Sequence, residues 1–176
     1  QGVEGAYSLV GMTENALYGV RDPLGVRPLV MGKIDDAIIL ASETCALDII
    51  GADYVRDVEP GELVIIDDNG IQSIRPFAAA KSRLCVFEYI YFARPDSVVD
   101  GTNVYEARKR IGAQLAIESP VDADIVVPVP DSGNPAAMGY AEQSGIPFEL
   151  GIIRNHYVGR TFIEPTNSIR HLGVKL

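Results

Sequence analysis

The chain has 176 residues and a net charge of −9, and 47% of its residues are hydrophobic and 22% charged. This composition is typical of a soluble globular protein with a buried core, and it excludes a disordered chain. The acidic balance argues against nucleic-acid binding, because affinity for a duplex depends on many Lys and Arg. The hydrophobic runs are shorter than the roughly 20 residues of a membrane helix, and no signal-peptide pattern is present. Two cysteines do not suggest a disulfide scaffold, so we expect a cytoplasmic protein without membrane contact.

Residues 1–77 are predicted to form consecutive strands in two packed β layers. Short aliphatic-rich runs alternate in this region with turn signals. The predicted strands are 6–12, 16–22, 27–33, 37–43, 62–68 and 71–77. A short helix is predicted at 44–50, because this segment follows a strand and precedes Gly51.

Two turns are predicted between these strands. Asp22-Pro23-Leu24-Gly25 reads as a β-turn that makes a hairpin connection. Asp68-Asn69-Gly70 is a second hairpin turn, since Asn-Gly suits positive φ at both central positions.

Beyond a connector at 78–83, the predicted order changes to strand, helix, strand, helix, strand. The run CVFEYIYF is rich in aromatic and β-branched residues and predicts a strand. The predicted elements are a strand at 85–92, a helix at 103–119, a strand at 124–130, a helix at 135–143 ended by Gly145, and a strand at 147–153. This βαβαβ order is typical of the start of a doubly wound parallel sheet.

Two segments follow predicted parallel strands, where ligands gather in open sheets. Asp131, Ser132 and Gly133 stand between a strand and a helix, where free backbone N–H groups favour an anion and a hydroxyl can ligate a hard cation. The alternative is that Asp131 or Ser132 merely caps the helix. The second segment, RNHYVGRTF, opens a tail with three Arg and one Lys against one Glu, whereas the rest of the chain carries −12. Its arginines suit phosphate oxygens, and the alternative is a solvated surface turn.

Five motifs occur in the order found in one family. They are RDPLGVRPL (21–29), ASETCALD (41–48), DVEPGELVII (57–66), CVFEYIYFARPDS (85–97) and RNHYVGRTFIEP (154–165). The chain therefore resembles the glutamine phosphoribosylpyrophosphate amidotransferases over nearly its whole length. The first three motifs are partly shared with other N-terminal-nucleophile glutamine amidotransferases, whereas EYIYFARPDS followed by YVGRTFI is specific to this family.

The resemblance implies an α+β domain followed by an α/β domain. Residues 1–80 would form the C-terminal part of an αββα glutaminase domain, and residues 81–176 the first βαβαβ of a type I phosphoribosyltransferase domain. The family hydrolyses glutamine, and the ammonia displaces pyrophosphate from phosphoribosylpyrophosphate in the presence of Mg²⁺. The product, phosphoribosylamine, opens purine biosynthesis. In the family the catalytic Cys lies before Gln1 and the phosphoribosyl-binding loop after Leu176, so we expect a fragment that is inactive alone.

The resemblance also implies roles for individual residues. Ser132 matches a Mg²⁺ contact, and Arg154, Tyr157 and Arg160 match a flexible loop that closes over phosphoribosylpyrophosphate. The chain departs from the family at Arg154, where Lys is usual, and at His156, where Arg is frequent; the histidine makes the charge at that position depend on pH.

Cys85 has two interpretations. By itself it is more often a small buried hydrophobe than a ligand, and no second cysteine stands near it at a metal-binding spacing. The resemblance matches Cys85 to a 4Fe-4S ligand in one branch of the family, with three partner cysteines after Leu176. It further implies purine nucleotides as feedback inhibitors and a homo-oligomer.

Two other functions fit parts of the pattern. A non-catalytic phosphoribosyltransferase-like regulator would bind a nucleotide and lack the N-terminal Cys. Another class II glutamine amidotransferase would carry a different domain after residue 80, and EYIYFARPDS speaks against it. The sequence on either side of this segment distinguishes them.

Overall fold

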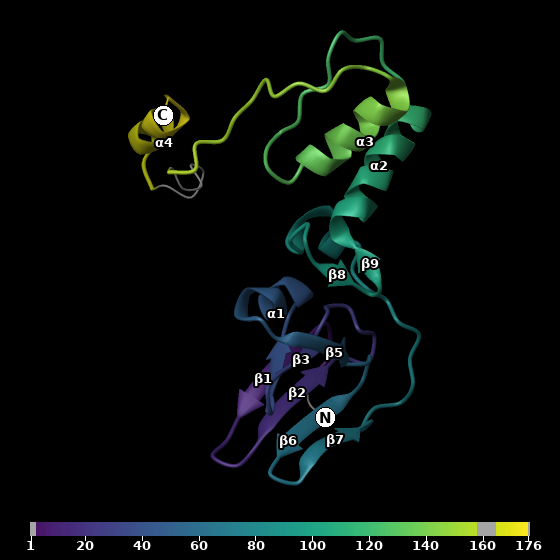
Figure 1. Ribbon diagram of the computed structural model, residues 1–176, viewed down its shortest axis with the longest axis vertical. Coiled ribbons are helices and arrows are strands. Elements are labelled where there is room, and N and C mark those ends of the chain that lie inside the picture. Colours follow the sequence, from purple (N-terminus) through teal and green to yellow (C-terminus); the bar gives the residue numbers. More distant parts are fainter. Residues whose placement is uncertain (1–2, 158–164, 176) are drawn as a thin grey trace. The chain divides into compact units, whose positions relative to one another are not determined.

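The structure is a computed structural model that describes residues 3–157 and 165–175 (Figure 1). It forms two compact units, Gln1–Arg110 and Ile111–Leu176, which are described separately. Among the described residues, no helix is both long and apolar enough to span a membrane.

The first unit contains two antiparallel sheets. The four-stranded sheet has the order β1 (Ser8–Met12), β2 (Leu17–Arg21), β6 (Leu63–Asp67), β7 (Gly70–Ile74). The three-stranded sheet has the order β4 (Ala37–Ala41), β3 (Val30–Ile34), β5 (Asp53–Asp57). The six strands predicted in this region are all present but shorter, and β3 ends and β7 begins one residue outside its predicted range.

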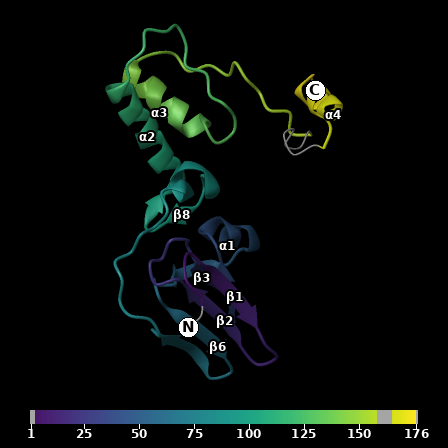
Figure 2. The same cartoon turned by 180° about the vertical axis from the view of Figure 1, so that it is seen from behind.

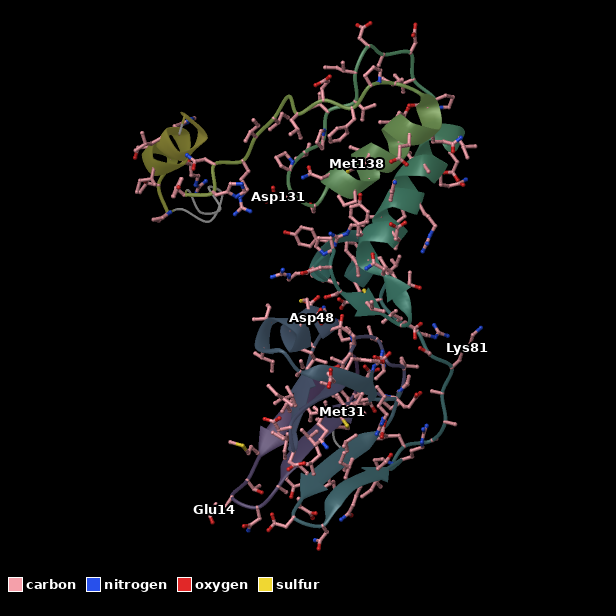
Figure 3. The ribbon with its side chains drawn as sticks, in the orientation of Figure 1. Glu14, Met31, Asp48, Lys81, Asp131 and Met138 are labelled. Atoms are coloured by element: carbon pink, nitrogen blue, oxygen red, sulfur yellow. The ribbon has the colours of Figure 1, made fainter. Side chains whose placement is uncertain are left out.

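The core lies on both faces of β3, because successive side chains of a strand point to opposite faces. On one face Met31 packs with Leu29, Val58 and Val64, the last of which belongs to the four-stranded sheet. On the other face Val30 packs with Leu47 and Ala52, and Leu47 belongs to α1 (Thr44–Ile50). Both views show α1 beside β3 (Figures 1 and 2), and Met31 lies among the strands (Figure 3). The layers are therefore helix, sheet, sheet, as the predicted β packing and helix 44–50 require.

Three details of this unit differ from the predictions. Strand β5 was missed because Asp53, Arg56 and Asp57 interrupt its apolar pattern. The Asp22–Gly25 turn closes with a 2.9 Å hydrogen bond from Gly25 N to Asp22 O, but it links β2 of one sheet to β3 of the other and makes no hairpin. The β6–β7 hairpin forms as predicted, yet positive φ falls on Gly70 alone (107°), which pairs with Asp67.

The strand predicted at 85–92 is wrong, since this segment forms a π-helix, η1 (Glu88–Phe92). Ala93 N donates to Glu88 O at 3.0 Å, which closes the wide turn. Buried Arg108, which belongs to helix α2 (Val104–Glu118), donates to the carbonyls of Tyr89 and Ala93, the latter at 2.8 Å. These contacts come from distant parts of the chain, and they override the local preference of aromatic and β-branched residues for a strand.

A short hairpin and a long helix follow η1. Strands β8 (Val98–Val99) and β9 (Thr102–Asn103) pair antiparallel. Helix α2 (Val104–Glu118) begins directly after them and confirms the helix predicted at 103–119.

The second unit holds the later turns of α2, helix α3 (Asn134–Ser144) and helix α4 (Asn167–Lys175). The predicted end of α3 is confirmed, because Gly145 adopts a left-handed C-cap with φ of 75°. Helix α4 was not predicted. The strands predicted at 124–130 and 147–153 are reduced to one isolated bridge, Val126 to Phe148, which is parallel as expected. Ile125 and Val129 are exposed, and a parallel strand persists where neighbours cover both of its faces.

Candidate functional site

The loop 131–133 leads from the bridge segment into α3, and its backbone is tightly packed. Gly133 occupies the N-cap position of α3, and its N–H donates to Val129 O at 3.1 Å. A Cβ at this position would lie 2.6 Å from the same carbonyl oxygen, so a larger residue does not fit without a shift. The loop therefore depends on glycine for its shape.

The side chains of this loop do not cap the helix. The N-cap of α3 is Gly133, and no side-chain cap hydrogen bond is formed. Asp131 and Ser132 are exposed and directly precede Gly133 in the chain, and Figure 3 shows Asp131 near the start of α3. The capping alternative for these two side chains is thus wrong in this structure.

Arg154 is brought to this loop. Its Nη1 lies 2.8 Å from Asp131 Oδ2, and both side chains are about half exposed. An exposed ion pair of this kind contributes about 0–1 kcal/mol, so Asp131 holds Arg154 only weakly. The pair places a cation beside the predicted anion site.

The other residues of the predicted lid are not brought to the loop by any described contact. The side chain of Tyr157 is fully exposed, and its N–H donates to Asn155 Oδ1 at 2.9 Å. Arg160 lies outside the described residues. The lid assignment of these two residues stays a prediction.

Cys85 lies in the first unit with a partly buried free thiol. Its backbone is fixed, because Cys85 N donates to Val26 O at 2.9 Å and its carbonyl accepts from Glu88 N at 3.0 Å. Within the described part of the chain, no group of three or more His, Cys, Asp or Glu is arranged to hold a metal. The cluster assignment therefore depends on residues that the described part does not supply.

A second polar site, which the sequence reasoning missed, borders a pocket of about 440 Å³ in the first unit. Buried Glu88 forms an ion pair with Arg27, whose guanidinium carbon lies 4.4 Å from the centroid of the Phe92 ring. Burial raises the pKa of Glu88; Arg27 opposes this rise and Glu43 adds to it. A lone acid inside the apolar run CVFEYIYF was the signal that could have revealed a buried charge.

The chain is similar to known amidophosphoribosyltransferases over nearly its whole length. It is 64% identical to that of Rhizobium etli, over 99% of this chain and 36% of the relative. It is 58% identical to the chloroplastic enzyme of Glycine max, over 99% of this chain and 31% of the relative. No family model matches the chain.

A solved structure agrees with these relatives. It is the glutamine phosphoribosylpyrophosphate amidotransferase from B. subtilis complexed with ADP and GMP, which matches with a TM-score of 0.88 and 54% identity. The match covers 97% of this chain and 37% of the B. subtilis chain. The chain thus spans about a third of the length of the relatives that it matches. Sequence and structure together show that it is homologous, along nearly all of its residues, to part of an amidophosphoribosyltransferase.

Proposed function

We propose that the chain is a segment of an amidophosphoribosyltransferase. The reaction converts glutamine, phosphoribosylpyrophosphate and water into phosphoribosylamine, glutamate and pyrophosphate, at the start of purine biosynthesis. The observation that carries the proposal is 64% identity to an enzyme of this name over 99% of the chain.

The proposed division places the end of a glutaminase domain at 1–80 and the start of a phosphoribosyltransferase domain at 81–176. The layered packing of α1 and two antiparallel sheets supports an αββα assignment for the first part. Helices α2 and α3 and the parallel bridge between Val126 and Phe148 support a doubly wound assignment for the second.

The proposed transferase site is the loop 131–133 with Arg154. The residues present fit Mg²⁺, because Ser132 offers a hydroxyl that caps no helix and Asp131 offers carboxylate oxygens next to it. A bound Mg²⁺ supplies positive charge to the diphosphate oxygens. Arg154 then adds a fixed cation that orients the diphosphate, and the backbone N–H groups at the start of α3 favour its negative charge. Tyr157 and Arg160 would close over the substrate and exclude water.

Cys85 is proposed as one ligand of a 4Fe-4S cluster. Such a cluster takes four cysteine thiolates, whereas this chain has two cysteines, so further ligands would have to come from outside it. The free, partly buried thiol of Cys85 is compatible with this role.

Purine nucleotides are proposed as regulators, supported by the B. subtilis enzyme that was solved with ADP and GMP. A homo-oligomer is proposed from the resemblance, and a cytoplasmic location is proposed from the use of cysteine in the sequence. The relative from Glycine max is chloroplastic, so location varies among the homologues.

The first prediction tests the lid in the full-length protein, with ammonia as nitrogen donor. Arg160→Ala should lose roughly 2–4 kcal/mol of transition-state stabilisation, because a charged donor to the diphosphate is removed. Arg160→Lys should recover part of the loss, since an ammonium keeps the charge but not the planar fork. Steady-state kcat/KM for phosphoribosylpyrophosphate measures both effects.

Arg75→Ala is the matched control, because Arg75 is an exposed arginine of the first unit. Glutamine hydrolysis without the second substrate should stay unchanged in Arg160→Ala. An unchanged kcat/KM in Arg160→Ala would contradict the lid role and favour the alternative that the basic segment is a solvated surface turn. A full-length wild-type protein that binds nucleotides but forms no phosphoribosylamine would favour the non-catalytic regulator instead. The 176-residue chain alone should form no phosphoribosylamine.

A further inference from the structure

Glu43 stands at the N-cap of α1 but does not cap its own helix. Its backbone is extended, with φ of −155° and ψ of 157°, and its side chain makes no cap hydrogen bond. Instead, Glu43 Oε2 accepts a hydrogen bond from Arg94 N at 2.9 Å and another from Ser97 Oγ at 2.8 Å. The carboxylate therefore ties the start of α1 to a turn about fifty residues later.

Ser97 supplies the cap that Glu43 does not. Its side chain is fully buried, and its Oγ accepts a 3.4 Å hydrogen bond from Cys45 N in the first turn of α1. Next to it, Thr44 Oγ1 accepts from Val98 N at 2.8 Å. The stretches 43–45 and 94–98 are thus held by four hydrogen bonds, two of which end on one carboxylate oxygen.

The same turn holds the start of α2. Val104 N donates to Ser97 O at 3.0 Å, and Tyr105 N donates to Pro95 O at 2.9 Å. These are N–H groups at a helix N-terminus, which have no partner within the helix. From α2, Arg108 in turn donates to the carbonyls of Tyr89 in η1 and of Ala93 at the C-cap of η1. One chain of contacts therefore runs from Glu43 through the 94–97 turn to α2 and η1.

We propose that Glu43, acting through Ser97, is a positioning residue that couples the two half-reactions of the amidotransferase. The inference rests on the proposed function, in which Glu43 belongs to the glutaminase part and Ser97 to the transferase part. A charged acceptor forms stronger hydrogen bonds than a neutral one. The carboxylate of Glu43 therefore holds the 94–97 turn, which belongs to the proposed transferase part, firmly to the start of α1 in the proposed glutaminase part. Glu43 also borders the 440 Å³ pocket with Arg27 and Glu88, so a shift of the turn reaches that pocket.

The experiment measures coupling in the full-length protein. Phosphoribosylamine formation is assayed with glutamine and, separately, with ammonia, and glutamate release is measured in parallel. Ser97→Ala and Glu43→Ala should lower the ratio of glutamine-dependent to ammonia-dependent kcat by about tenfold, because displacements far from the chemistry can disturb reacting geometry. Glutamate release should continue without matching product. Glu43→Gln keeps an acceptor oxygen at the same reach but loses the charge, so it should restore part of the ratio.

Asp96→Ala is the matched control, because Asp96 lies in the same turn and its carboxylate pairs with Arg94 on the surface. Its ratio should equal that of the wild type. The double variant Glu43→Ala/Ser97→Ala should resemble either single variant, since residues that act as one unit are not additive. If Glu43→Ala does not fold, Ser97→Ala removes a single hydroxyl and still decides the matter.

The outcomes separate the two proposals. A wild-type protein that forms no phosphoribosylamine from either nitrogen source overturns the proposed function. An active wild type whose coupling ratio is the same in Ser97→Ala overturns the positioning role and leaves the proposed function standing. A lowered melting temperature with an unchanged ratio assigns the network to stability alone, which also overturns the inference.

Discussion

At the scale of single residues, Glu62 is a buried charge whose carboxylate accepts four hydrogen bonds. Its side chain is 1% exposed, and its oxygens lie 2.8 and 2.7 Å from the two terminal nitrogens of Arg56. Ser73 Oγ and Glu59 N donate to it at 2.6 and 2.7 Å. Burial raises the pKa of Glu62, but the hydrogen bonds from Arg56, Ser73 and Glu59 outweigh burial and lower it to about 2.

Acid should therefore destabilise the fold through Glu62. A lowered folded-state pKa gives stability that is present above the unfolded value near 4.5 and is lost as pH falls towards 2. At pH 7, Glu62→Gln should cost about 2–3 kcal/mol of unfolding free energy, because it leaves Arg56 unpaired. Urea unfolding at pH 7 and pH 3 measures this cost, which should shrink at pH 3. Glu14→Gln, at an exposed position, is the control; an equal cost for both variants would contradict the assignment.

The position of a residue could be predicted from the sequence where the residues that determine it lie next to it in the chain. Gly133 and the exposed oxygens of Asp131 and Ser132 stand where the strand–loop–helix pattern placed them. Arg27, the partner of Glu88, comes from a distant segment, so the burial of Glu88 could not be predicted from the local sequence. The approach of Arg154 to Asp131 was likewise invisible, although the sequence did predict both as neighbours of an anion site.

At the scale of elements, α2 and α3 pack unusually closely at Gly112. A Cβ there would lie 2.6 Å from the carbonyl carbon of Ala136, a backbone atom that cannot turn away. In an open helix Gly→Ala stabilises by up to about 1 kcal/mol. Here Gly112→Ala should instead destabilise by about 1–3 kcal/mol, because overpacking forces the helices apart.

The midpoint of urea unfolding measures the effect of Gly112→Ala. Gly11→Ala serves as the control, since nothing lies within 4 Å of a Cβ at that position. A midpoint that rises in Gly112→Ala would mean that α2 and α3 are not in contact at this point.

Helices with local start and stop signals were predicted well. Gly51 and Gly145 adopt left-handed C-caps with φ of 71° and 75°, and each ends the predicted helix. The π-helix η1 has no such signals, because Arg27 and Arg108 hold it from outside. Six of the paired strands were also predicted, whereas β5, β8 and β9 were missed. The strands predicted at 124–130 and 147–153 share only one bridge.

At the scale of the whole molecule, a cluster at Cys85 would make the full-length protein depend on iron. Its ligands would come from segments far apart in the sequence, and binding free energy of such a site contributes to folding. Anaerobically purified full-length protein should contain iron and sulfide and absorb visible light, and Cys85→Ser should lose these. Cys45→Ala is the control, because Cys45 is a buried residue of α1. Wild-type protein without iron would contradict the cluster assignment and favour the interpretation of Cys85 as a small hydrophobic residue.

The order of the sequence motifs was a reliable guide to the relationship of the whole chain to amidotransferases. The hydrophobic patterns of single strands were a less reliable guide to how those strands pair into sheets. Motifs such as EYIYFARPDS are specific even where their local structure is misjudged, as with η1. A parallel sheet is a collective property of several strands and their covering helices, so a run of aliphatic residues predicts its presence but not its partners.

The cap that Ser97 places on α1 has a consequence for the order of folding. Helix α1 has 7 residues and would be marginal alone, because short helices do not offset the cost of nucleation. The bond from Cys45 N to Ser97 Oγ spans 52 positions, so the chain between them must close before the cap exists. The amide proton of Cys45 should therefore exchange with solvent through opening of the whole first unit and not through fraying of α1. Its protection from exchange during refolding would show when the 94–97 turn packs against α1.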